Sequence, residues 1–245
     1  MKIVNIEKKM FLGPDYSSAK TSAWMRNCKD VMSGHFDVEG REKIRKKMNK
    51  IGLVLSDRDV ENLLNVYKSN PVLASELAKD PGRQSFHETQ FGDWLSNLPS
   101  EIFNTVKRLP SSGKNALYVC SGKVFANKDK PEGMIGKSID FSFKSSGCIY
   151  YVSHKHTTDE GGGQDNQHSN LQDFLREAQS SSASNVFFLG ICDGDYYDRP
   201  SQKNRNISRK EYMDKYVSGA NTKVLSSVDL IDFIAKKSNI KYNVF

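Results

Sequence analysis

A polar stretch near the middle of the chain, Tyr150 to Gln167, contains the residue types that metal-assisted hydrolysis uses. It includes His154, Lys155 and His156, then three acidic residues and a glycine triplet. In a β-strand alternate side chains share a face, so Ser153 and Lys155 are expected on one side and the two histidines on the other. The stretch therefore predicts a chemically active strand end.

A carboxylate from the preceding strand can join Lys155. The pattern predicts a hairpin with strands at Ser138–Lys144 and Cys148–Thr157 and a turn at Ser145–Gly147, which brings Asp140 beside Lys155. A carboxylate can hold a hard divalent ion, while a lysine positions the attacking water and stabilises developing negative charge. The competing interpretation is an ordinary cross-strand ion pair.

The spacing of these residues resembles the signature of the PD-(D/E)XK nuclease superfamily, here Ile139-Asp140 followed by Ser153-x-Lys155. The resemblance covers residues 137–197. Two departures stand out: Ile139 occupies a position that is often proline, and Ser153 one that is usually acidic. The second departure leaves the metal site one carboxylate short.

Some restriction endonucleases of this superfamily also have serine before the lysine and take the missing acid from another element. The candidates are Glu88, in an expected helix, then Asp165, with Asp159 and Glu160 behind them. The resemblance implies that Asp140 and a second acid, preferably Glu88, hold one or two Mg²⁺ ions.

The function implied by this resemblance is that of a type II restriction endonuclease, which hydrolyses double-stranded DNA at a short specific site. Lys155 would orient the attacking water, and Ser153 would hydrogen-bond a water on the metal. Because palindromic sites mirror two-fold protein symmetry, a homodimer is expected.

The segment after the predicted strand adds candidate DNA contacts. In several restriction endonuclease groups a glycine-rich turn followed by amides comes directly after the strand with the lysine. Gly162 and Gly163 would allow close approach to phosphate, while Gln164, Asn166 and Gln167 could contact base edges. A flexible surface loop is the competing interpretation.

The composition fits a folded protein with a polyanionic partner. Lys and Arg number 36 against 29 Asp and Glu, giving a net charge of +7 and a pI near 9.1. Basic runs at 41–50 and 198–210 are candidate phosphate contacts, although such runs are more often solvated helix faces. Four dispersed cysteines and the lack of a long apolar run predict a reduced, cytoplasmic protein.

The expected fold class is α/β, a mixed central sheet flanked by helices. Residues 1–110 are predicted to be mainly helical, packed on the core as a dimerisation region and DNA clamp, with Ser56 capping one helix. Residues 111–245 are predicted to form the nuclease-like core. Its further elements are expected as a strand pair at 116–125, a helix at 170–179, a buried strand at 185–194, and a helix, strand and helix to 237.

Two other functions compete with this interpretation. His154, His156, His168 and Asp165 could form a zinc hydrolase site, since His-x-His presents two imidazoles on one strand face. A DNA-binding protein that has lost catalysis would also account for Ser153.

Overall fold

The computed structural model describes residues 3–35, 38–81, 84–129, 136–158 and 162–245. The chain divides into two compact units, one formed by residues 1–14 with 87–245 and the other by residues 15–86. The sequence placed a boundary near residue 110; in this division β2 (Asn104–Arg108) and most of α5 (Gln84–Ser96) belong to the larger unit.

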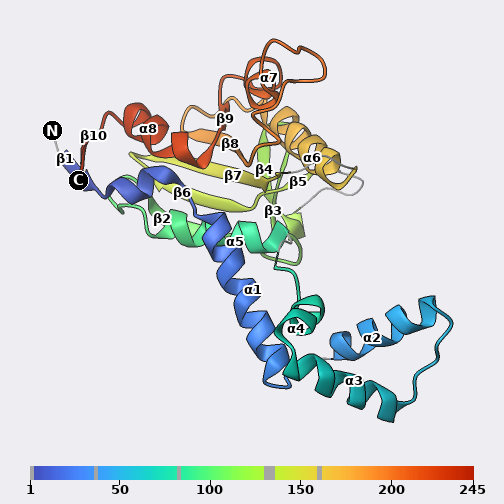
Figure 1. The fold of residues 1–245 in the computed structure, drawn as a ribbon. Helices are drawn as coiled ribbons and strands as arrows, with labels where there is room; N and C mark the ends of the chain where they lie inside the picture. The colour runs from blue at the N-terminus through green and yellow to red at the C-terminus, as the bar shows by residue number, and fades with distance from the viewer. Residues whose placement is uncertain (1–2, 36–37, 82–83, 130–135, 159–161) are drawn as a thin grey trace. The chain divides into compact units, whose positions relative to one another are not determined.

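A five-stranded mixed sheet forms the centre of the larger unit (Figure 1). Its strand order is β2-β6-β7-β8-β9; β2, β6 and β7 are antiparallel neighbours, whereas β7, β8 and β9 run parallel. The bounds are β2 Asn104–Arg108, β6 Phe141–Ser145, β7 Cys148–His156, β8 Val186–Asp193 and β9 Thr222–Leu225. The expected mixed α/β fold is confirmed.

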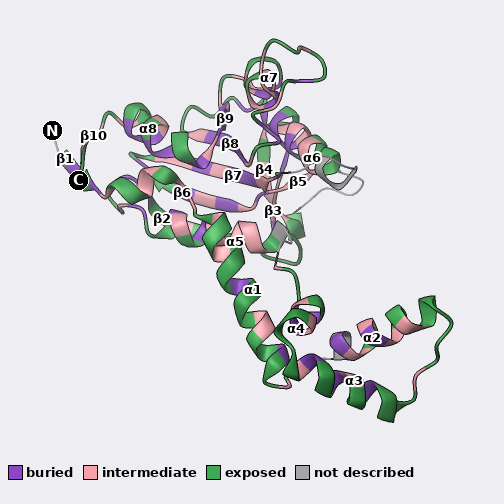
Figure 2. Cartoon of the chain, in the orientation of Figure 1, coloured by how far each residue is buried: buried purple, intermediate pink, exposed green. Residues whose placement is uncertain are grey.

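Helices cover both faces of this sheet. On one face α5 (Gln84–Ser96) and α8 (Ser227–Lys237) pack on side chains that include Val152 and Leu189. On the other face α6 (Gly162–Ala178) and α7 (Arg209–Tyr216) pack on Phe188 and its neighbours. Figure 2 shows the buried residues concentrated along the central strands. Adjacent residues of β8 thus serve opposite cores, as strand alternation requires.

Smaller elements complete this unit. β3 (Leu117–Cys120) pairs with β4 (Lys123–Ala126) and β5 (Lys137–Ser138), which confirms the expected strand pair. Parallel strands β1 (Ile3–Ile6) and β10 (Lys241–Val244) pair separately. The short 3₁₀ helices are η1 (Lys8–Leu12) and η2 (Asn127–Asp129).

The second unit is helical. Its helices are α1 (Tyr16–Met32), α2 (Val38–Lys50), α3 (Asp57–Ser69) and α4 (Pro71–Leu77). The Ser56 hydroxyl accepts a hydrogen bond from the amide of Asp59, whose carboxylate accepts one from Ser56 in return, so the predicted cap is confirmed. Apolar side chains of α1 to α4 form a core of their own.

Two local predictions are wrong. Residues 104–108 were expected to be helical, but they form β2, because the segment pairs with β6, with an irregularity between Asn104 and Lys107 where Thr105 has a φ of +53°. The glycines at 162 and 163 were expected in a turn, yet they are the first residues of α6. None of the helices in the described part of the chain is long and apolar enough to span a membrane.

Candidate active site

The β6–β7 hairpin fixes the backbone of Asp140 just before β6. Its amide donates a hydrogen bond to the Val152 carbonyl at 2.9 Å, and its carbonyl accepts one from the Leu109 amide at 2.9 Å. Asp140 is therefore held on both sides by neighbouring chain segments.

Three donors from β7 converge on one carboxylate oxygen of Asp140. Oδ2 accepts hydrogen bonds from the Ser153 hydroxyl at 3.2 Å, the His154 amide at 2.9 Å and the Lys155 ammonium at 3.2 Å. The Asp140 and Lys155 side chains are only 10% and 13% exposed. All three bonds are to Oδ2, and no hydrogen bond to Oδ1 comes from the residues that the structure describes.

Glu88 on α5 brings a second carboxylate to the same lysine. Its Oε1 lies 3.8 Å from Lys155 Nζ, and its Oε2 lies 4.0 Å from a guanidinium nitrogen of Arg108. Arg108 is itself placed by donating a hydrogen bond to the Thr89 hydroxyl at 2.8 Å. Lys155 thus lies within ion-pair distance of both expected acids.

These two carboxylates fit a magnesium ion in number and type. Mg²⁺ usually takes one or two protein carboxylates and fills its octahedral shell with water and substrate phosphate oxygens. Among the described residues no group of three or more metal-ligating side chains forms. Asp140 and Glu88 are the residues that would hold the ion.

Ser153 contacts Asp140 directly. It is 4% exposed, and its hydroxyl donates to the aspartate. An acidic residue at this buried position would place a second negative charge against Asp140, whereas serine supplies a donor.

The three histidines of the zinc alternative lie in different surroundings. His154 is fully buried, with its ring stacked on Phe91 of α5 at 4.4 Å between centroids, and His156 stacks on His87 at 4.1 Å. His168 is on α6 beside Gln172. This arrangement disfavours a histidine-held metal.

A buried network behind the site was missed by sequence reasoning. Nε2 of His154 lies 3.2 Å from Oδ2 of Asp193, and Oδ1 of Asp193 accepts hydrogen bonds from the amide and hydroxyl of Ser227, each at 2.9 Å. Asp193 falls within the buried strand predicted at 185–194, and that pattern assigns it no partner. It joins β7, β8 and the first turn of α8. Sequence reasoning also missed that Arg108 lies beside Glu88. The one sequence signal for it was a basic residue at the end of a short segment that contains β-branched residues.

The remaining candidates lie around α6. Asp165 accepts a hydrogen bond from the Tyr196 hydroxyl at 2.7 Å, and Gln167 accepts one from the Thr157 hydroxyl at 2.9 Å. Asn166 is exposed. Gly162, Gly163 and Gln164 begin the helix, while Asp159 and Glu160 lie outside the described residues. The structure brings Asp140, Ser153, Lys155 and Glu88 together and places Asp165 elsewhere.

Comparison with known proteins assigns no family. No family model and no curated protein matches the chain. Can2 from Sulfobacillus thermosulfidooxidans, solved in complex with cyclic tetra-adenylate, aligns over 92% of this chain and 55% of its own, with 8% identity and a TM-score of 0.32. Protein VC1899 from Vibrio cholerae aligns over 92% and 57%, with 9% identity and a TM-score of 0.31. The chain thus spans a little over half the length of these two proteins.

Proposed function

We propose that this protein is a Mg²⁺-dependent endonuclease that hydrolyses double-stranded DNA at a short specific site, as type II restriction enzymes do. The convergence of Asp140, Lys155 and Glu88 carries the proposal. An ordinary surface ion pair needs neither near-complete burial nor a second carboxylate at the same ammonium.

The chemistry is an in-line displacement at phosphorus. Asp140 and Glu88 would hold Mg²⁺, which when bound would stabilise negative charge at the phosphate oxygens. Lys155 orients the attacking water and offsets the negative charge that develops on the phosphoryl group. The oxygen of that water forms a new bond to phosphorus and its proton is released to solvent; the bond to the sugar oxygen breaks, and this leaving oxygen takes a proton from a solvent water. Ser153 and the His154 amide keep Asp140 in position.

DNA as substrate is supported by charge and by the position of α6. The net charge of +7 favours a polyanion. Asn166 and Gln167 lie on the helix that follows β7, so they remain the proposed DNA contacts with Gly162, Gly163 and Gln164. A homodimer in which each subunit cuts one strand is part of the same proposal.

The test is incubation of the purified protein with unmethylated phage DNA and Mg²⁺, followed by gel electrophoresis. Discrete fragments are expected from the parent and none from Asp140→Ala. Asp232→Asn is the matched control, since this aspartate is exposed on α8 and lies outside the site and the basic runs; it should cut normally. Equal cleavage by Asp140→Ala would rule out the assignment.

One rival, a DNA-binding protein without catalysis, is favoured by Ser153 and by the absence, among the described residues, of a group of three or more metal-ligating side chains. That protein would shift DNA in a gel without cutting it under any divalent ion. Its DNA affinity would be unchanged in both Asp140→Ala and Lys155→Met.

A further inference from the structure

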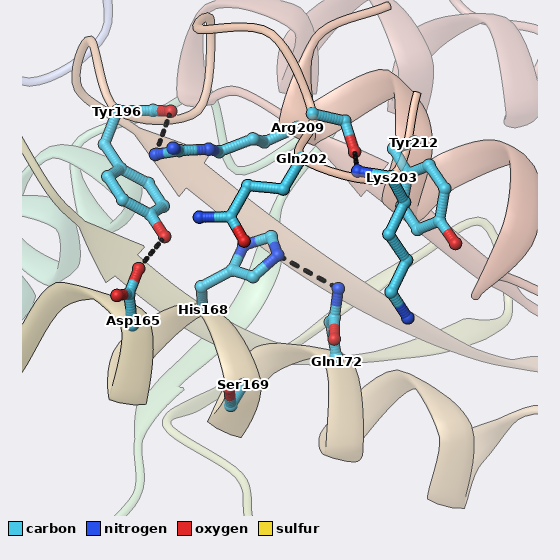
Figure 3. A pocket seen from close by; sticks show the side chains of 10 residues that line it. Asp165, His168, Ser169, Gln172, Tyr196, Gln202, Lys203, Arg209 and Tyr212 are labelled. Carbon is cyan, nitrogen blue, oxygen red and sulfur yellow. Dashed lines mark hydrogen bonds between the residues drawn. The ribbon is translucent and has the colours of Figure 1, made fainter. Parts of the chain in front are cut away.

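A polar cavity lies in the larger unit, between α6, the segment after β8 and α7 (Figure 3). Its volume is about 300 Å³, at the lower end of the range for small-molecule sites. Neither Asp140, Lys155 nor Glu88 lines it. It is a separate feature from the candidate active site.

The walls of this cavity are fixed before any ligand arrives. The guanidinium of Arg209 lies 3.9 Å from the centre of the Tyr196 ring and donates to the Tyr196 carbonyl at 3.4 Å. The Tyr196 hydroxyl in turn donates to Asp165 at 2.7 Å. Ser208 caps α7, which holds Arg209 at the first position of that helix. Because Arg209 is 7% exposed, its charge is held at a buried position of the wall.

The charges of the lining favour an anion. Arg209 and Lys203 contribute two positive charges against the single negative charge of Asp165. Lys203 is exposed and forms no ion pair with any residue that the structure describes. Its ammonium group is therefore accessible to an anionic ligand. Burial, and then the charge of Arg209, lower the pKa of His168 below its usual 6.5, whereas Asp165 raises it. The imidazole is therefore neutral at pH 7.

The remaining lining groups suit a flat heterocycle with hydrogen-bonding edges. The amide of Gln172 lies 2.9 Å from Nε2 of His168, and Gln202 brings a second amide. In the view of Figure 3, Tyr212 and Lys203 lie on one side, Tyr196 and Asp165 on the other, and His168 and Gln202 between them. Glutamine amides pair with base edges, and aromatic rings stack on base faces.

We infer that this cavity binds a single nucleotide, with its phosphate at Lys203 and Arg209 and its base near Gln172, Gln202 and Tyr212. The nucleotide can come from two sources, a free mononucleotide or a residue extruded from DNA. The inference does not depend on cleavage, since it rests on residues outside the site of Asp140.

The cavity is connected to the chain segment that follows Lys155, which favours a nucleotide extruded from DNA as the ligand. The Tyr196 amide donates to the carbonyl of Thr157, two residues after Lys155 in the chain. The Thr157 hydroxyl donates to Gln167 on α6. The residue that follows β7 is thus bonded directly to the elements that form the cavity.

Calorimetric titration tests the free source, with the full chain carrying Asp140→Ala so that no substrate is cut. The ligands are dAMP, dGMP, dCMP and dTMP, the four unphosphorylated nucleosides, and inorganic phosphate. We expect at least one nucleotide to bind roughly tenfold more tightly than its nucleoside or phosphate alone.

Lys203→Met should lower the affinity for every nucleotide by roughly tenfold, while Gln172→Met should reduce the preference among bases. Lys236→Met, an exposed lysine on α8, should change neither.

Duplexes containing 2-aminopurine test the DNA source, because the fluorescence of this base rises when it leaves the stack. A rise with the Asp140→Ala protein that Lys203→Met abolishes would identify extruded DNA as the ligand, even if free nucleotides fail to bind. Two outcomes overturn the inference: neither assay responds, or phosphate alone binds as tightly as every nucleotide. If the protein binds nucleotides but never cuts DNA, the proposed nuclease function is wrong and the inferred nucleotide site is supported.

Discussion

At the residue scale, Ser153 decides whether Asp140 is held by three donors or two. Ser153→Ala removes the hydroxyl that donates to Oδ2 and leaves the His154 amide and Lys155 in place. A hydrogen bond to a charged group contributes about 1.5–3 kcal/mol, so we expect cleavage to slow by roughly tenfold or more with DNA affinity unchanged. Single-turnover cleavage measures this, with Ser142→Ala on β6 as control. An unchanged rate would show that Ser153 does not position Asp140.

Lys155 is expected to act in the chemical step more than in binding. Lys155→Met keeps the length of the side chain but removes the charge that faces both carboxylates. Loss of one preorganised charge in a water-poor site lowers the rate by about 10²–10³-fold. Cleavage rate and gel-shift affinity, measured on the same DNA, should separate the two effects. Lys144→Met, an exposed lysine on β6, is the matched control. Parallel loss of affinity and rate in Lys155→Met alone would assign this lysine to DNA binding.

His168 gives the protein a pH dependence with a definite sign. Its folded-state pKa is lowered from 6.5, mainly by burial, so the unfolded chain takes up the proton first as the pH falls. The stabilising contribution of the neutral imidazole is complete above about pH 7 and declines as the pH drops through 6.5. Denaturant unfolding between pH 8 and 5 should show this decline, and it should be smaller in His168→Gln. An identical slope in the variant would contradict the assignment.

At the element scale, Gly194 allows β8 to end against the end of β7. Its φ is +93°, and a Cβ atom there would lie 2.3 Å from the Thr157 carbonyl oxygen. Gly147 is a matched control, because its φ is +80° and its Cβ would meet no atom within 4 Å. Both alanine variants incur the backbone cost of about 1 kcal/mol, but Gly194→Ala should cost at least 1 kcal/mol more in unfolding free energy. Equal losses of unfolding free energy in the two variants would mean that the Thr157 carbonyl can move away from the added Cβ atom at no cost.

Elements with strong periodicity were predictable, whereas contacts made across the fold were not. The β6–β7 hairpin follows from alternation around a Ser-Gly turn, so the meeting of Asp140 and Lys155 could be predicted from local pattern. The approach of Glu88 to Lys155 depends on how α5 packs on the sheet, and only the resemblance suggested it. The pairing of Asp193 with Ser227 joins distant segments, and no local signal encodes it. β2 was mistaken for helix because its partner strand, and not its own short sequence, decides its conformation.

At the scale of the whole molecule, two-fold symmetry predicts how DNA is cut. The site of one chain contains one Asp140–Lys155–Glu88 group, which under the proposed mechanism would hydrolyse one strand. A dimer bound to a palindromic site would therefore cut both strands in one encounter, and supercoiled plasmid should become linear without accumulation of nicked circles.

Mixing the parent with an excess of Asp140→Ala, under conditions that exchange subunits, should give mixed dimers that nick one strand only. Sedimentation velocity, with and without DNA, measures the assembly directly. A monomer that linearises plasmid through a nicked intermediate, unaffected by the excess of Asp140→Ala, would contradict the dimer and require each strand to be cut in a separate encounter.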